Sequence, residues 1–159
     1  MAKSNGIQTR VRVDTSTGGL YDISGDVTNL DWALPRTVQD VTGVNQAAMA
    51  RILLLADFSG TINGIWNPGG ADTSTAHEVF RTIPSTDVTR TLQITIGSSG
   101  AVSTDPQLVG DTVSATAAIG IEVLLTDYPL TRAQSGELTF AVPFLLQDGR
   151  APLWSVSSA

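Results

Sequence analysis

The sequence predicts a mainly β protein: an antiparallel β-sandwich or barrel with one short helix packed on its side. Several segments alternate apolar and polar residues, as strands with one covered face do. Only one segment, "TAHE" at 75–78, carries a clear helix-start signature. With 159 residues the chain is long enough for one core, so we expect a single domain over 1–159.

The N-terminal segment predicts a flexible arm followed by three strands. Residues 1–6, "MAKSNG", are small and polar, and "IQTRVRV" at 7–13 alternates with a two-residue period. The segment "LYDISGDVTNLDW" at 20–32 then predicts a short strand, a turn at 24–26 and another strand that ends at Trp32.

Residues 33–51 follow no steady period and predict a long loop, with only a weak indication of helix at 45–51. Long loops without structure of their own are uncommon in compact domains and are often functional. We therefore expect this loop to be a contact surface. Its candidate assembly contacts are Arg36, Val38, Asp40, Val44 and Met49.

The segment "RILLLADFSGTINGIWN" at 51–67 predicts strand material that is interrupted at Ser59–Gly60. The pair Asn63–Gly64 could instead form a tight hairpin turn, for which it is a strong local signal. We favour one continuous strand across it.

A short helix follows, because Thr75 is a good N-cap and Glu78 stands at the third helical position of a reciprocal capping box. Pro84 is expected to end this helix. The predicted apolar face consists of Val79, Phe80 and Ile83.

The C-terminal half predicts three more strands. "RTLQITI" at 90–96 alternates, and the segments 112–128 and 136–148 are expected to form a pair of long strands joined by a hairpin loop at 129–136. Pro143 indicates an edge or a bulge. Residues 155–159 are expected to be a C-terminal tail. The predicted inward face of the last strand is Leu138, Phe140, Val142, Phe144 and Leu146.

Composition limits the possible functions. Only 15% of the residues are charged, which is low for a free monomer and suggests surface that is covered in an assembly. The net charge is −6, and one lysine among nine basic residues argues against a surface that grips phosphates. No apolar run is long enough for a membrane span, and the N-terminus lacks the apolar region of a signal peptide, so we expect synthesis in a cytoplasm.

The tryptophans are Trp32, Trp66 and Trp154. Packing in the core explains them better than stacking on nucleic-acid bases does.

No catalytic, cofactor or metal site is expected, and we expect no enzyme. The lone histidine, His77, has no second histidine or cysteine to form a metal or nucleophile site, and is expected on the helix surface. The acidic residues Asp22, Asp26 and Asp31 lack the oxygen spacing of a calcium loop, so turn and cap roles are expected for them.

Three phrases in this order resemble the major tail tube proteins of long-tailed bacteriophages. They are the strand start at Asp22–Ser24, the "G-x-x-x-G" strand with Gly60 and Gly64 followed by His77 and Phe80 on a short helix, and "LTDY" leading into "GELTFAVPFLLQDG". The similarity covers residues 20–154.

This resemblance implies a sandwich or barrel with one helix beside it, and a structural virion protein that assembles with itself. Six copies would form a ring, and stacked rings would form a tail tube through which DNA passes without specific binding. Loop 33–51 and the arm at 1–6 would be the ring-to-ring contacts. Other phage tail or head proteins would be further partners, no membrane would be involved, and the protein would be located in the tail of the virion.

Two alternatives remain open. The same fold would suit a capsid decoration, minor capsid or head–tail completion protein, which would form no tube; loop 33–51 favours the tube because stacking requires such a contact. A sandwich that binds sugars or small ligands is the third possibility, but closely spaced aromatic residues for a binding platform are missing.

Overall fold

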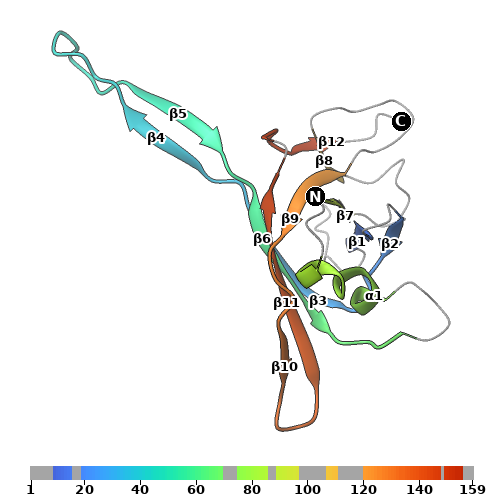
Figure 1. Cartoon of the computed structure of the whole chain (residues 1–159). Helices are drawn as coiled ribbons and strands as arrows, with labels where there is room; N and C mark the ends of the chain where they lie inside the picture. Colours follow the sequence, from blue (N-terminus) through green and yellow to red (C-terminus); the bar gives the residue numbers. More distant parts are fainter. Residues whose placement is uncertain are drawn as a thin grey trace, which may run out of the picture.

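The computed structural model describes residues 9–15, 19–69, 75–85, 89–96, 107–110, 120–147 and 149–155. These residues form a β-rich body from which one long hairpin projects (Figure 1). The strands are β1 (Thr9–Asp14), β2 (Leu20–Asp22), β3 (Val27–Ala33), β4 (Arg36–Asp40), β5 (Arg51–Ala56), β6 (Ser59–Ile65), β7 (Arg90–Ile96), β8 (Gln107–Val109), β9 (Ile121–Leu125), β10 (Leu130–Arg132), β11 (Leu138–Leu146) and β12 (Leu153–Ser155). Within this part of the chain, α1 (Ala76–Phe80) is the only α-helix, followed by a 3₁₀ turn (Ile83–Ser85). The predicted mainly β class with one short helix is confirmed.

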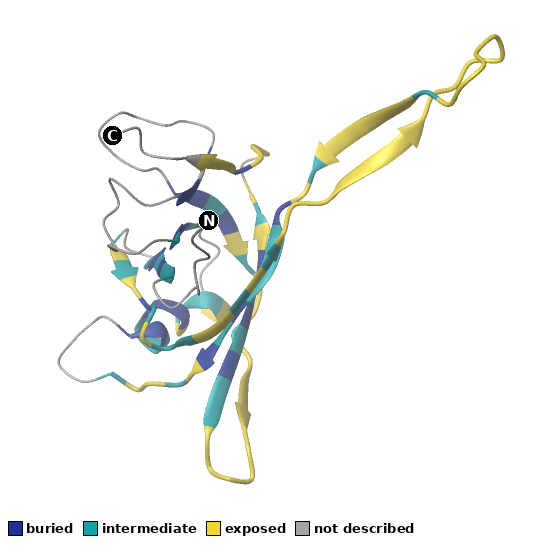
Figure 2. Cartoon of the chain, turned by 180° about the vertical axis from the view of Figure 1, so that it is seen from behind, coloured by how far each residue is buried: buried dark blue, intermediate teal, exposed yellow. Residues whose placement is uncertain are grey.

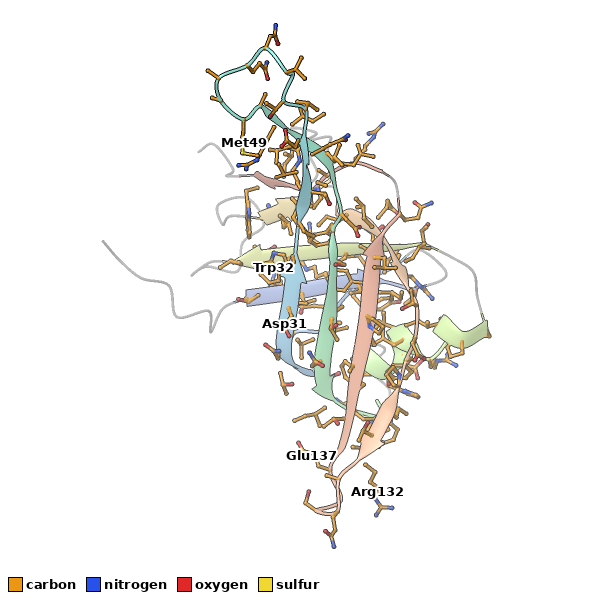
Figure 3. All side chains as sticks on the ribbon, turned by 90° about the vertical axis from the view of Figure 1, so that its left-hand side faces the viewer. Asp31, Trp32, Met49, Arg132 and Glu137 are labelled. Atoms are coloured by element: carbon orange, nitrogen blue, oxygen red, sulfur yellow. The ribbon has the colours of Figure 1, made fainter. Side chains whose placement is uncertain are left out.

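Ten strands form one antiparallel sheet in the order β12-β8-β7-β9-β11-β6-β3, with β1 and β2 attached through β7 and β10 attached through β11. Strand β9 pairs with both β7 and β11 and so joins two halves of the sheet. One half contains β3, β6, β11 and β10. In Figure 3 the strands β3, β6 and β11 cross β1 and β7, so the two halves face one another as the layers of a sandwich do.

The core lies between these halves and α1. Strand β11 alternates as predicted: Phe140, Val142 and Phe144 are buried, and the residues between them are not. Apolar side chains of β1, β6, β7 and β9 meet them. The buried residues of these strands and of α1 include Val11, Val13, Ile62, Val79, Phe80, Leu92, Ile94, Ile121 and Val123.

The two glycines of β6 allow phenylalanine rings to pack against its backbone. A Cβ at Gly60 would collide with the Asp31 carbonyl oxygen and the Phe144 ring, and one at Gly64 would collide with the Phe140 ring. Strand β6 runs through Asn63–Gly64 without a turn, which confirms the continuous strand. The glycine spacing therefore serves close approach between neighbouring strands and rings.

The prediction of a long loop at 33–51 was wrong. Residues 36–40 and 51–56 form a hairpin with a register shift between Arg36 and Val38, and no helix forms at 45–51. The interruption predicted at Ser59–Gly60 lies instead at Asp57–Phe58, where the side chain of Phe58 enters the core. Strand material was predicted correctly at 51–56, but β4 and its pairing with β5 were missed. Neither face of the hairpin is covered by the described part of the chain, so its residues do not alternate between apolar and polar.

The start of α1 matches the prediction only in part. The Thr75 side chain accepts a hydrogen bond from the Glu78 backbone N–H, as an N-cap does. The reciprocal bond of the capping box is replaced, since the Glu78 carboxylate pairs with Arg81 at 2.7 Å. The helix ends at Phe80, before Pro84, which lies in the 3₁₀ turn.

The C-terminal strands are shorter than predicted. In the predicted strand 112–128 the structure has β9 over Ile121–Leu125, and residues 111–119 lie outside the described part. The predicted hairpin loop at 129–136 contains strand β10, which pairs with β11. The expected arm at 1–6 lies outside the described residues; of the expected tail at 155–159, Ser155 ends β12 and the rest is not described.

Candidate assembly surfaces

The hairpin formed by β4 and β5, residues 36–56, is the most conspicuous feature of the molecule, and we call it the arm. It projects away from the body, and nearly all of its residues are exposed (Figures 1 and 2). Its base is closed by a hydrogen bond of 3.0 Å from the Asp57 N–H to the Pro35 carbonyl oxygen. The arm is therefore a separate two-stranded sheet attached to the body at one point.

All five predicted contact residues lie on the arm. Arg36 is near the base, where its Nε donates to the Leu54 carbonyl oxygen at 3.0 Å, and Met49 is near the tip (Figure 3). Val44 is fully exposed, and the Asp40 carboxylate accepts hydrogen bonds from Thr42, which lower the pKa of Asp40 below its ordinary value. The remaining residue, Val38, is 51% exposed.

Sequence reasoning missed the apolar residues of β5. Their exposed fractions range from 38% to 90%, although none of the side chains is polar. An unbroken apolar run in a strand is typical of one that is covered on both faces, so "RILLLA" was the available signal. These residues are Ile52, Leu53, Leu54 and Leu55.

The β3-β6-β11-β10 half of the sheet ends in an unpaired strand edge on each side. Among the described residues β3 pairs only with β6, and β10 pairs only with β11. They lie on opposite sides of the β3-β6-β11-β10 half of the sheet (Figure 3). Unpaired edges offer backbone N–H and C=O groups to another strand.

The outer face of this half carries small and mostly uncharged side chains. Three cross-strand rows on β3, β6 and β11 define it, and none of their residues is buried. Asp31 carries the single charge in these rows, which contain no lysine or arginine. The rows are Asp31–Thr61–Pro143, Asn29–Asn63–Ala141 and Ala33–Ser59–Leu145.

The arm and the β10–β11 hairpin extend from opposite ends of the molecule. In Figure 3 Met49 lies at one end, and Arg132 and Glu137 lie at the other. A hollow of about 430 Å³ near this second end is lined by Ile65, Trp66 and Leu138 together with these two charged residues and Gly136. It contains one cation and one carboxylate but no nucleophile paired with a base.

Two tryptophans that are distant in the sequence are neighbours in the structure. The ring centroids of Trp32 and Trp154 lie 6.5 Å apart. Trp32 packs partly against the core, but Trp154 is 52% exposed, so the core role predicted for it was wrong. Strand β12 pairs only through three residues with β8, which leaves this ring uncovered.

A groove of about 400 Å³ lies next to Trp32, between β1 and β3. Its lining contains no ionisable side chain, which excludes acid–base chemistry by the groove itself. The lining residues are Thr9, Val11, Ser24, Val27, Thr28, Asn29, Leu30 and Trp32.

The sequence suggested that His77 lies on the helix surface, but in the structure its ring contacts two other side chains. Trp66 Nε1–H donates to His77 Nδ1 at 3.1 Å, and the Tyr128 hydroxyl lies 3.1 Å from the same nitrogen. Burial, together with the Asp26 carboxylate, raises the pKa of Tyr128 to about 12. These contacts fix α1 to the end of β6 and to the segment after β9, which is a structural role.

Two of the three acidic residues, Asp22 and Asp26, have the turn and cap roles expected of them. Asp22 Oδ1 accepts from the Ser24 N–H, and Asp26 Oδ2 accepts from the Ala76 N–H at 2.8 Å, at the start of α1. Asp31 accepts from the Asn29 amide instead. In the described part of the chain, no three or more acidic or histidine side chains are grouped as metal ligands would be.

Burial shifts two further titratable groups. Burial raises the pKa of Asp14 and lowers that of Arg90, whose side chain donates to Thr82 Oγ1 at 2.8 Å and to the Asp14 carbonyl oxygen. Arg90 is a buried anchor for β7 that the sequence analysis did not identify. Among the described residues, no helix has the length and apolar character needed to cross a bilayer.

No protein-family model matches the sequence, and no curated protein matches it either. Solved structures share the fold. A chain of the virion of a native gene transfer agent particle has a TM-score of 0.64 and 14% identity, over 97% of this chain and 100% of that one. A chain of the tail of an empty gene transfer agent particle, with C6 symmetry, has a TM-score of 0.64 and 16% identity, over 98% and 100%. A chain of the anti-feeding prophage baseplate, 6-fold symmetrised, has a TM-score of 0.61 and 10% identity, over 100% and 99%.

Proposed function

We propose that this chain is a structural virion protein that assembles with itself into rings, and that the rings stack into a tail tube that conducts DNA. The observation that carries the proposal is the arm, a projecting hairpin with exposed apolar residues that finds no cover within its own chain. Exposed apolar surface of this kind marks interaction sites. The protein acts through its shape, and we propose no catalytic activity.

Lateral contacts within a ring would use the two free strand edges. The half formed by β3, β6, β11 and β10 is antiparallel and has four strands, so β3 and β10 run in opposite directions. Rotation of a copy about an axis along the strands brings its β10 beside β3 of the first copy, and the two strands are antiparallel. Head-to-tail contacts of this type generate a ring where the rotation closes, and such pairing would remove the free edges.

Contacts between rings would use the arm, which lies at the opposite end of the molecule from the β10–β11 hairpin. In a stack, the arm of one ring would extend onto the body of the next. The predicted contacts Arg36, Val38, Asp40, Val44 and Met49 would belong to this interface.

The outer face of the β3-β6-β11-β10 half would line the channel. It contains no cation in its three rows, and Asp31 adds a negative charge. Affinity for DNA comes largely from cations that neutralise phosphates, so such a wall lets DNA slide.

Two of the solved structures with this fold are a tail with C6 symmetry and a 6-fold symmetrised baseplate. This supports six copies per ring and other tail proteins as further partners. It also supports a location in the tail of a virion.

The test is electron microscopy of the purified chain at rising concentration, compared with a variant in which an Asn-Gly turn replaces residues 36–56. The hydrogen bond between Pro35 and Asp57 closes the arm at its base, so the body of the variant should fold. We expect hollow tubes from the natural chain and at most single rings from the variant. Normal tubes from the variant would exclude the arm as the stacking element. Small oligomers of the natural chain that coat capsids would favour a decoration protein instead.

A further inference from the structure

The two faces of the arm are both apolar on β5. Leu53 pairs across the hairpin with Val38, and Ile52 pairs with Gln39. Because side chains alternate along a strand, Leu53 and Val38 share one side, which we call the Leu53 face, and Ile52 and Gln39 share the other, which we call the Ile52 face. The register shift between Arg36 and Val38 interrupts this alternation at Leu54 and Leu55, which lie closer to the base of the arm.

Neither face is covered within the chain. On the Leu53 face the exposed fractions are 58% for Leu53 and 51% for Val38. On the Ile52 face the exposed fraction of Ile52 is 48%. A hairpin that lay on one flat surface would leave one of these faces in water, and strands with one wet face normally place polar residues there.

We propose that the arm inserts between two neighbouring copies of this chain, so that one copy covers the Leu53 face and another covers the Ile52 face. The inference rests on the proposed stacking of rings and identifies what binds each side of the arm. Cover on both faces would also stabilise the arm, since an isolated two-stranded hairpin is marginal in water.

Charge indicates that the partners are copies of the same chain. The charged residues of the arm are Arg36, Asp40 and Arg51, which give it a net charge of +1. The chain as a whole has a charge of −6, so −7 lies outside the arm. The arm is thus complementary in charge to the rest of its own sequence, and two arms would repel one another.

The two arginines of the arm are available for this contact. Arg51 lies beside Met49 Sδ at 3.3 Å, and in the described part of the chain neither it nor Arg36 forms an ion pair. The body has exposed carboxylates, among them Asp57 and Glu137. An arginine from the arm of one copy can pair with such a carboxylate on the next.

Single cysteines test both faces directly, because the natural chain contains none. The variants Leu53→Cys and Ile52→Cys are reacted with a small maleimide as subunits, below the concentration at which they polymerise, and again as polymer. We expect the reaction rate of both thiols to fall by about tenfold or more on polymerisation, since thiol reactivity follows exposure.

Polar substitution provides a second readout on the same two positions. Leu53→Ser and Ile52→Ser should each raise the concentration needed for polymerisation by about tenfold, while the matched controls Leu53→Val and Ile52→Val change it little. Arg51→Glu should also raise it, and Arg51→Lys should not. The folded subunit should melt at an unchanged temperature in all of these variants, because the core does not include the arm.

The possible failures are distinguishable. If the natural chain polymerises but one of the two thiols stays reactive, or one serine variant assembles normally, the arm lies on a single surface and this inference is wrong while the tube proposal stands. If the natural chain does not self-associate and both thiols stay reactive, the tube proposal fails, and copies of the chain are not the partners of the arm.

Discussion

Replacement of Phe140 by alanine tests the central packing of the body. The ring is 3% exposed, and its centroid lies 5.6 Å from that of Phe80 and 6.0 Å from that of Tyr128. It also fills the space that Gly64 leaves on β6. Truncation of a buried phenylalanine costs about 3–5 kcal/mol, and lost aromatic pairs favour the upper part of this range. For a chain of this size that corresponds to a melting temperature lower by about 6–20 °C.

The assay is urea unfolding followed by tryptophan fluorescence, at a concentration where the subunits do not polymerise. Leu145→Ala is the matched control, because this residue lies on the opposite face of the same strand and is 45% exposed. We expect it to cost less than about 1 kcal/mol, as surface substitutions usually do. If Phe140→Ala cost no more than Leu145→Ala, the inward face assigned to β11 would be wrong.

Three further predictions concern residues around α1. Gly64→Ala should destabilise the subunit by about 1–3 kcal/mol in the same assay, because the added methyl group meets the Asp26 carbonyl oxygen and the Phe140 ring; an unchanged midpoint would contradict this. Asp26→Ala should cost about 1–2 kcal/mol, because the Ala76 N–H at the helix start loses its acceptor, and a loss of a few tenths would show that water replaces it fully. The pKa of Tyr128 is raised to about 12 in the folded chain, so the phenolate forms first in the unfolded chain. The neutral hydroxyl therefore contributes its full stabilisation of the folded chain below the ordinary pKa near 10. This stabilisation is lost as the pH rises from 10 through 12. Unfolding measured across that interval should therefore show a smaller loss of stability in Tyr128→Phe than in the natural chain, and equal slopes would refute the assignment.

Much of the body could be predicted because its strands have one face in the core. Where burial alternates, as in β11, the apolar residues alternate too, and both the strand and its inward face follow from the sequence. The helix start was predictable for a similar reason, since Thr75 forms a local hydrogen bond with Glu78, only three positions further along the chain. The partner of Glu78 was not, because Arg81 competes for its carboxylate and sequence spacing alone does not decide between them.

Contacts between distant segments could not be predicted. Trp66 and Tyr128 meet at His77 because β6 and the segment after β9 both end beside α1, and nothing in the local sequence indicates that meeting. The exposure of Trp154 likewise depends on how little of β12 is paired. A single histidine and scattered tryptophans are too sparse to carry a periodic signal.

The region 33–51 was predicted as a contact surface, which stays a prediction, and as a loop, which was wrong. The reason for the error bears on the proposed function. Strand prediction from periodicity assumes that the chain covers one face itself, and β4 and β5 violate this assumption because the chain covers neither. If neighbouring copies supply this burial, as proposed above, the apolar residues of β5 satisfy a rule that applies only in the assembly. An apolar run such as Ile52–Leu55, exposed in an isolated subunit with a net charge of −6, would be an aggregation hazard if it had no specific partner. Its retention on a projecting hairpin, away from the core, is what the proposed polymerisation requires.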